Sequence, residues 1–123
     1  MPVRLWDAET FGVLQTTLEG QSSVLSAAFS FDGEQVVTGS SDTKARIFNM
    51  ETGALHMTLE GHTDWVLCCA FSNGGKFVVT GSRDKTARLW NALTGVLQMT
   101  LEGHSGYVTS CAFSSDGKHV QRF

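Results

Sequence analysis

The sequence predicts an all-β protein made of repeated four-stranded units, and two observations support this. The first is a spacing of about 42 residues at which one pair of residues recurs, as Leu5-Trp6, Ile47-Phe48 and Leu89-Trp90. A second pair recurs at the same spacing, as Ala28-Phe29, Ala70-Phe71 and Ala112-Phe113. The other observation is that apolar residues alternate with polar ones in short runs bounded by turn residues, which is typical of strands and not of helices.

The unit in the second half of the chain has the clearest elements, taken in order. Residues 66–71 form an apolar run, a glycine-containing turn follows, and residues 77–80 return as the second strand. A tight turn over 81–85 leads into a third strand at 86–90. The turn at 91–95 then sends the chain back along 96–101. We therefore expect four antiparallel strands in each repeat.

Turn residues recur at equivalent places in the other copies. Asp32-Gly33 and Asp116-Gly117 stand where the first hairpin of each unit turns, and Asp-Gly sequences favour the positive φ angles of such turns. The repeats divide the chain into four segments within a single domain. These are a strand pair over 1–19, two complete units over 20–60 and 61–102, and another strand pair over 103–123.

Composition excludes several functional classes. The 123 residues carry a net charge of −3, which provides no basic surface for nucleic acid or for an anionic membrane. No apolar run is long enough to span a bilayer, so we expect an intracellular protein, cytoplasmic or nuclear. The three cysteines lack metal-ligand spacing and are interpreted as buried thiols, and no pattern indicates a cofactor or a metal.

One set of residues has two interpretations. His62, Thr80 or Ser82, and Asp84 contain the side-chain types of a hydrolase triad. The same types also serve as a buried hydrogen-bonded network that connects strands, in which each polar group finds a partner. We favour the structural interpretation and expect no catalysis. A propeller-fold enzyme is the remote alternative.

Between Gly61 and Trp90 the chain resembles the WD-repeat family, through a Gly-His pair, a Gly-Ser-x-Asp-x-Thr turn and a terminal Leu-Trp pair. The signature Trp-Asp pair itself occurs once, as Trp6-Asp7, while Phe48-Asn49 and Trp90-Asn91 replace it elsewhere. The resemblance implies β-propeller blades, about three blade equivalents here, forming an open arc in one chain because closed propellers typically need about 4–8 blades.

The resemblance also implies a structural tetrad in each blade. In the unit over 61–102 its members are His62, Thr80, Asp84 and Trp90. Partial tetrads are expected elsewhere, from Thr38, Asp42, His104 and Trp6. In the unit over 20–60, glutamine stands near the histidine position and Phe48 has no indole donor, so that tetrad cannot form and that blade is expected to be less stable.

Binding residues of the family commonly lie at the rim of the propeller, which corresponds here to Trp65, Tyr107, Arg83 and Asp64. Exposed aromatic and arginine side chains are strong contact anchors, although the two rings could instead pack between blades and Arg83 could simply be solvated. We therefore expect a non-catalytic protein–protein interaction scaffold whose partners are other proteins or peptides. A second copy joined head to tail is a possible partner, and a truncated or degenerate fragment without independent function is the main alternative.

Overall fold

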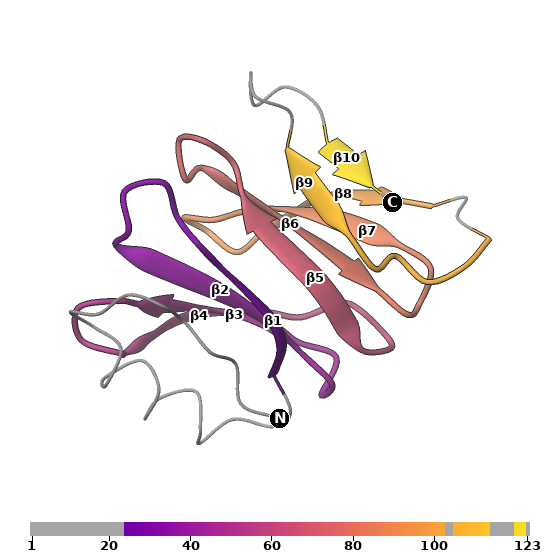
Figure 1. Cartoon of the computed structure of the whole chain (residues 1–123), viewed down its shortest axis with the longest axis horizontal. Helices are drawn as coiled ribbons and strands as arrows, with labels where there is room; N and C mark the ends of the chain where they lie inside the picture. The colour runs from indigo at the N-terminus through magenta and orange to yellow at the C-terminus, as the bar shows by residue number, and fades with distance from the viewer. Residues whose placement is uncertain (1–23, 103–104, 114–119, 123) are drawn as a thin grey trace.

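The computed structural model describes residues 24–102, 105–113 and 120–122, and every regular element in these ranges is a β-strand (Figure 1). The first sheet holds β1 (Val24–Phe29), β2 (Gln35–Ser40), β3 (Ala45–Asn49) and β4 (Leu55–Leu59) in that order. The second holds β5 (Val66–Phe71), β6 (Phe77–Ser82), β7 (Ala87–Asn91) and β8 (Leu97–Leu101). A third pairs β9 (Cys111–Phe113) with β10 (Val120–Arg122). The prediction of an all-β fold with four-stranded antiparallel sheets is confirmed.

The two large sheets repeat the same strand register. Val24 pairs with Ser40 in the first sheet, and Val66 pairs with Ser82 in the second, each followed by a β-bulge one residue later. The first hairpin of each sheet turns on a glycine with a left-handed backbone, Gly33 at φ 74° and Gly75 at φ 70°. Glycine adopts these angles without strain, which explains why it recurs there.

The second strand of the second sheet is longer than the sequence predicts. The pattern ends this strand at Thr80 because Gly81 and Ser82 are turn residues, yet β6 continues to Ser82. Gly81 stays in the ladder because it pairs with Cys68 on one side and with Ala87 on the other. The turn itself is shorter, and Lys85 takes the left-handed conformation at φ 70°.

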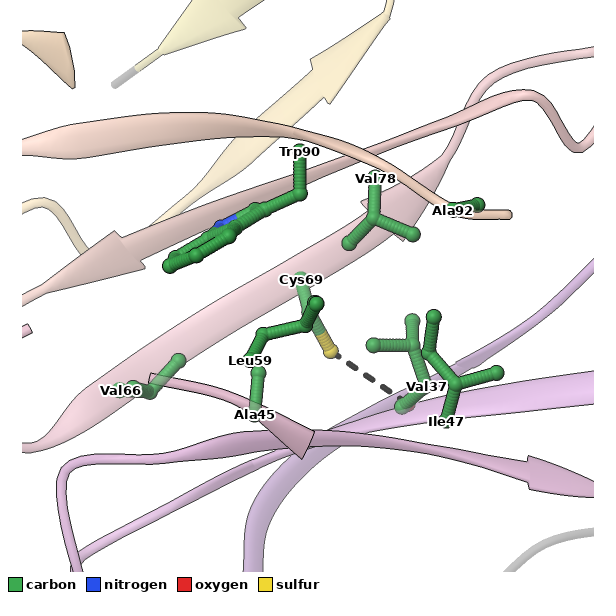
Figure 2. Close-up of a cluster of buried hydrophobic side chains, with 9 residues drawn as sticks. All are labelled: Val37, Ala45, Ile47, Leu59, Val66, Cys69, Val78, Trp90 and Ala92. Atoms are coloured by element: carbon green, nitrogen blue, oxygen red, sulfur yellow. Dashed lines mark hydrogen bonds between the residues drawn. The ribbon is translucent and has the colours of Figure 1, made fainter. Parts of the chain in front are cut away.

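The sheets pack through the first strand of each, which we call the inner strand. β1, β5 and β9 lie one after another, and β2 and β6 also contact the inner strand of the following sheet (Figure 1). Between the first two sheets lies an apolar core to which both contribute (Figure 2): Val37, Ala45, Ile47, Leu59, Val66, Cys69, Val78, Trp90 and Ala92. Over the described ranges these sheets form an open arc of blades, as the sequence predicts.

Glycine allows the close approach of neighbouring sheets. A Cβ atom at Gly39 would lie 2.8 Å from Val66 Cγ1, and one at Gly81 would lie 2.6 Å from Val108 Cγ1. Both glycines are at the equivalent place in β2 and β6. A side chain there would push the following sheet away, so these positions hold the blades at their spacing.

Candidate functional site

A buried polar network connects the loop before β5 to β6, β7 and the turn between them. His62 Nδ1 lies 2.8 Å from Asp84 Oδ2, and His62 Nε2 lies 2.7 Å from Thr80 Oγ1. The indole nitrogen of Trp90 donates to the same Thr80 oxygen at 2.9 Å. The structure therefore brings together the four side chains that the resemblance assigns to a tetrad.

The two ends of this network and the charge of the imidazole determine the direction of the hydrogen bonds in it. An indole N–H can only donate and a carboxylate can only accept, so Trp90 donates to Thr80 Oγ1 and the protonated Nδ1 of His62 donates to Asp84. Because burial favours the neutral imidazole, Nε2 is an acceptor and Thr80 Oγ1 donates to it. The imidazole is held as the neutral Nδ1–H tautomer.

The pKa values agree with a neutral imidazole beside a charged carboxylate. Burial lowers the pKa of His62 below its ordinary value of 6.5, although its bond to Asp84 acts in the opposite direction. Burial would raise the pKa of Asp84, but hydrogen bonds from Thr86 and His62 and from the backbone of Thr63 lower it to about 2.

Asp84 has its acceptor capacity filled within the fold. Its Oδ2 accepts from His62 and from the backbone N–H of Thr63 at 3.1 Å. Its Oδ1 accepts from the Thr86 hydroxyl at 2.6 Å and from the Thr86 backbone N–H at 2.9 Å. The turn motif contains Thr86 but does not indicate a role for it in the network, and its place two residues after the aspartate is the signal for this role.

The bonds from Thr80 to His62 and from His62 to Asp84 are those of a hydrolase triad, but the hydroxyl is not available to a substrate. Thr80 is fully buried, and its oxygen also accepts from the indole of Trp90. Ser82, the other hydroxyl considered for a triad, donates instead to the backbone carbonyl of Asp64 at 3.2 Å. No substrate carbonyl could reach either oxygen without opening the core.

The equivalent positions of the first sheet hold a different arrangement. Thr38 is buried in β2 and Phe48 in β3, as their counterparts are in the second sheet. Asp42, however, binds Arg46, whose Nη2 donates to Asp42 Oδ2 at 2.6 Å. The sequence pattern does not indicate this ion pair. Arg46 binds Asp42 here, whereas His62 binds the equivalent carboxylate, Asp84, in the second sheet. Trp6 and His104, the other partial-tetrad residues, lie outside the described residues.

A second cluster lies at the end of the blades where β6 turns into β7. The guanidinium carbon of Arg83 is 4.2 Å from the centre of the Trp65 ring and 5.2 Å from that of Tyr107. Its Nε is 3.7 Å from Asp64 Oδ1. The structure thus brings all four proposed rim residues into one group, which we call the rim cluster: Asp64, Trp65, Arg83 and Tyr107.

The rim cluster joins two successive blades. Trp65 precedes the inner strand β5, Tyr107 lies shortly before the inner strand β9, and Arg83 lies between them. Both rings keep much of their surface in solvent, at 42% exposure for Trp65 and 55% for Tyr107. The rings are therefore not buried between blades. The guanidinium of Arg83 packs against each of them.

Backbone bonds fix the loops that carry the rim cluster. The N–H of Arg83 donates to the carbonyl of Trp65 at 2.9 Å, and the N–H of Val108 donates to the carbonyl of Ser82 at 3.0 Å. Trp65 and Arg83 are thus tied directly, and Tyr107 is tied through the residue that follows it. Rigid presentation of exposed aromatic rings lowers the entropy lost when a partner binds them.

Within the described residues, no group of three or more His, Cys, Asp or Glu side chains is arranged to hold a metal ion. Over the same ranges the structure contains no helix that is long and apolar enough to cross a membrane.

Comparison with known proteins identifies the repeats. The sequence model of the family described as WD domain, G-beta repeat matches residues 12–49, 53–91 and 95–120. The curated protein called Protein tipD, from Dictyostelium discoideum, is 35% identical over 60 residues, which cover 49% of this chain and 10% of that protein. This chain therefore matches about a tenth of the length of that relative.

Proposed function

We propose that this chain, which belongs to the WD-repeat family, is a non-catalytic scaffold that binds other proteins or peptides through its rim cluster. WD repeats generally mediate protein–protein interaction, and domains built from them are typically not catalytic. One observation supports the assignment to the rim: Arg83 lies against both Trp65 and Tyr107 while the two rings stay largely exposed.

The chemistry of this cluster suits a protein partner. Tryptophan, tyrosine and arginine are the residue types that most often dominate interface energies. The two rings are amphipathic and need little ordering on binding, while Asp64 adds a carboxylate beside them that accepts hydrogen bonds from a partner. The polar network of His62, Thr80, Asp84 and Trp90 has a structural role in this proposal, since it fixes the loops on which the rim is carried.

The first sheet offers a comparison within the same chain. By the repeat spacing, Ser41 stands where Arg83 stands and Ser23 stands where Trp65 stands. The anchoring residues are therefore specific to the second blade and to its junction with the third. We also propose an intracellular location, cytoplasmic or nuclear, because Cys68, Cys69 and Cys111 are all free thiols.

The test compares protein capture by matched variants of the full chain. Trp65→Ser, Arg83→Ser and Tyr107→Ser remove the anchors, and Leu55→Ser removes an apolar side chain of similar exposure, 52%, from the outer strand β4. The solution mass by light scattering and the circular dichroism spectrum of each variant establish that it is folded. We expect proteins captured from a cell extract by the parent chain and by Leu55→Ser to be lost from all three rim variants.

Two results would overturn the proposal. If the rim variants and Leu55→Ser capture the same proteins as the parent, the rim cluster is not the contact surface. If the parent chain aggregates and binds a dye that reports exposed apolar surface, the alternative of a fragment without independent function is correct.

A further inference from the structure

Two cysteines from neighbouring blades lie against each other in the core. Cys68 Sγ, on β5, is 2.8 Å from Cys111 Sγ, on β9. β5 and β9 belong to different sheets, so this contact crosses the junction between the second and third blades. Each cysteine is 8% exposed, which leaves a small path to solvent.

The same contact exists one blade earlier, which shows that blade packing produces it. Ser26 Oγ, on β1, lies 3.3 Å from Cys69 Sγ, on β5. The sequence separation is 43 residues in both pairs. At each junction a residue just after the β-bulge meets the residue one place further along the next inner strand. In the first junction this brings together a hydroxyl and a thiol, and in the second it brings together two thiols.

The surroundings of the pair hold the Cys68 sulfur toward Cys111. A Cβ atom at Gly81 would lie 2.5 Å from Cys68 Sγ, so β6 packs closely on one side of the thiol. Val108 lies on another side, with its carbonyl oxygen 3.7 Å from Cys68 Sγ. The two sulfur atoms therefore face each other within a tightly packed cluster: Cys68, Val79, Ala87, Val108 and Cys111.

The two thiols are chemically unequal. The hydrogen-bonded contact with Cys111 and a backbone hydrogen bond from Gly81 lower the pKa of Cys68, whereas the contact with Cys68 and burial raise the pKa of Cys111. Cys68 is consequently the sulfur that ionises first, and the thiolate is the form that reacts with oxidants. Cys69 points to the other face of β5, and burial raises its pKa to about 12, so it is comparatively inert.

We propose that Cys68 and Cys111 form a reversible disulfide between the second and third blades when the chain meets a peroxide. The Cys68 thiolate attacks one oxygen of hydrogen peroxide, which breaks the O–O bond and gives a sulfenic acid and hydroxide. The Cys111 sulfur then attacks the Cys68 sulfur, the S–S bond forms, and the sulfenic oxygen leaves as water. Overall two thiols lose two protons and two electrons, and one peroxide becomes two waters.

The disulfide would strengthen the least supported of the described sheets. β9 and β10 have three residues each and pair with one another, and a two-stranded sheet is marginal without further packing. A covalent bond from β9 to β5 would anchor that sheet to the second blade. Because a small thiol reductant breaks the bond, the junction would be firm under oxidising conditions and looser under reducing ones.

The test treats the folded full chain with hydrogen peroxide, alkylates the remaining thiols and digests with trypsin. The predicted product is an intramolecular link between the peptides 47–76 and 89–118, with fragmentation placing it at Cys68 and not at Cys69. We expect the thermal midpoint of the oxidised chain to rise by at least about 5 °C and to return to its starting value with dithiothreitol.

Three variants test the roles of the individual thiols. Cys69→Ser should form the link as the parent does. Cys111→Ser should accumulate a sulfenic acid at Cys68 that dimedone traps, whereas Cys68→Ser should give little trapped adduct at Cys111. The same reaction in guanidinium chloride is the control, because an unfolded chain has no reason to prefer Cys68 to its neighbour.

Several outcomes would overturn the proposal. A link at Cys69, a bond between separate chains, or the same mixture of products in the folded and the unfolded chain would each show that the native contact does not direct the chemistry. If a variant does not fold, the fragmentation map of the parent chain alone still decides, because it distinguishes the two adjacent cysteines.

Discussion

Asp42 and Asp84 stand at the same place in the second hairpin of successive blades, yet they bind different partners. Asp84 accepts from His62 at 2.8 Å, and Asp42 accepts from Arg46 at 2.6 Å. Both carboxylates also accept from the backbone N–H two residues later, Thr86 for Asp84 and Lys44 for Asp42. One turn geometry therefore serves a neutral imidazole in one blade and a guanidinium in the other.

This difference predicts unequal effects of one substitution at the two sites. Asp84→Asn should lower the free energy of unfolding by about 2–4 kcal/mol, because it disturbs a buried network with four bonds to the carboxylate. Asp42→Asn should cost only about 1 kcal/mol, since its ion pair is partly exposed. Urea unfolding followed by circular dichroism measures both. Equal losses would show that the two carboxylates contribute alike.

Trp90→Phe copies the residue that the first blade already has, Phe48. The change removes the indole that donates to Thr80 and leaves a small cavity, so we expect a loss of about 1–3 kcal/mol. Thr80→Val should cost more, because it leaves both the indole N–H and the imidazole nitrogen without a partner. The urea concentration at the midpoint should be highest for the parent, lower for Trp90→Phe and lowest for Thr80→Val. A lower midpoint for Trp90→Phe than for Thr80→Val would contradict this account.

The same network predicts that stability falls in acid. The pKa of His62 is lower in the folded chain than its ordinary 6.5, and that of Asp84 is about 2 instead of 3.8. The unfolded chain therefore binds more protons in both ranges, so the free energy of unfolding decreases as the pH falls below 6.5 and decreases again below 3.8.

Thermal unfolding across a pH series measures this dependence. In His62→Gln the decrease between pH 7 and pH 5 should become smaller, because the histidine that resists protonation is gone. His56→Gln, on the exposed part of β4, is the control for the same replacement outside the network. A profile that is unchanged in His62→Gln would mean that other groups cause the loss.

Gly81, at a blade junction, should be far more sensitive to substitution than Gly74, a hairpin glycine without a left-handed backbone. Gly81→Ala places a methyl group 2.5 Å from Cys68 Sγ and 2.6 Å from Val108 Cγ1, so we expect a loss of about 2–4 kcal/mol. The Cβ atom that Gly74→Ala adds would have no atom within 4 Å, so the free energy of unfolding should stay within about 0.5 kcal/mol of the parent value. Chemical unfolding of both variants decides, and a neutral Gly81→Ala would show that the junction has room.

Much of the fold follows from the sequence because the period fixes where each strand and turn recurs. The hairpins that turn on Gly33 and Gly75, the four-stranded sheets and the aspartate turn are all local features. The end of β6 is not a local feature. Gly81 stays in the strand because it pairs with residues of β5 and β7, and a local pattern cannot show this pairing.

The candidate sites divide in the same way. The sequence predicts the tetrad of His62, Thr80, Asp84 and Trp90 through a motif, since the spacing that defines the repeat also defines these positions. The contact of Arg83 with two rings and the approach of Cys68 to Cys111 depend on how one sheet lies against the next. The sequence does not predict the ion pair between Arg46 and Asp42, because the motif of this unit lacks a histidine and offers no other partner for the carboxylate.

The boundaries of the repeat in sequence do not coincide with the boundaries of the sheets. The family match over 53–91 includes β4 from the first sheet together with β5, β6 and β7 of the second. If recombination between repeats duplicates such a unit, the new copy contributes one strand to the sheet before it and three to its own. An added repeat would thus share a sheet with its neighbour as soon as it folds. The array can therefore gain or lose whole repeats while every sheet between its two ends remains four-stranded.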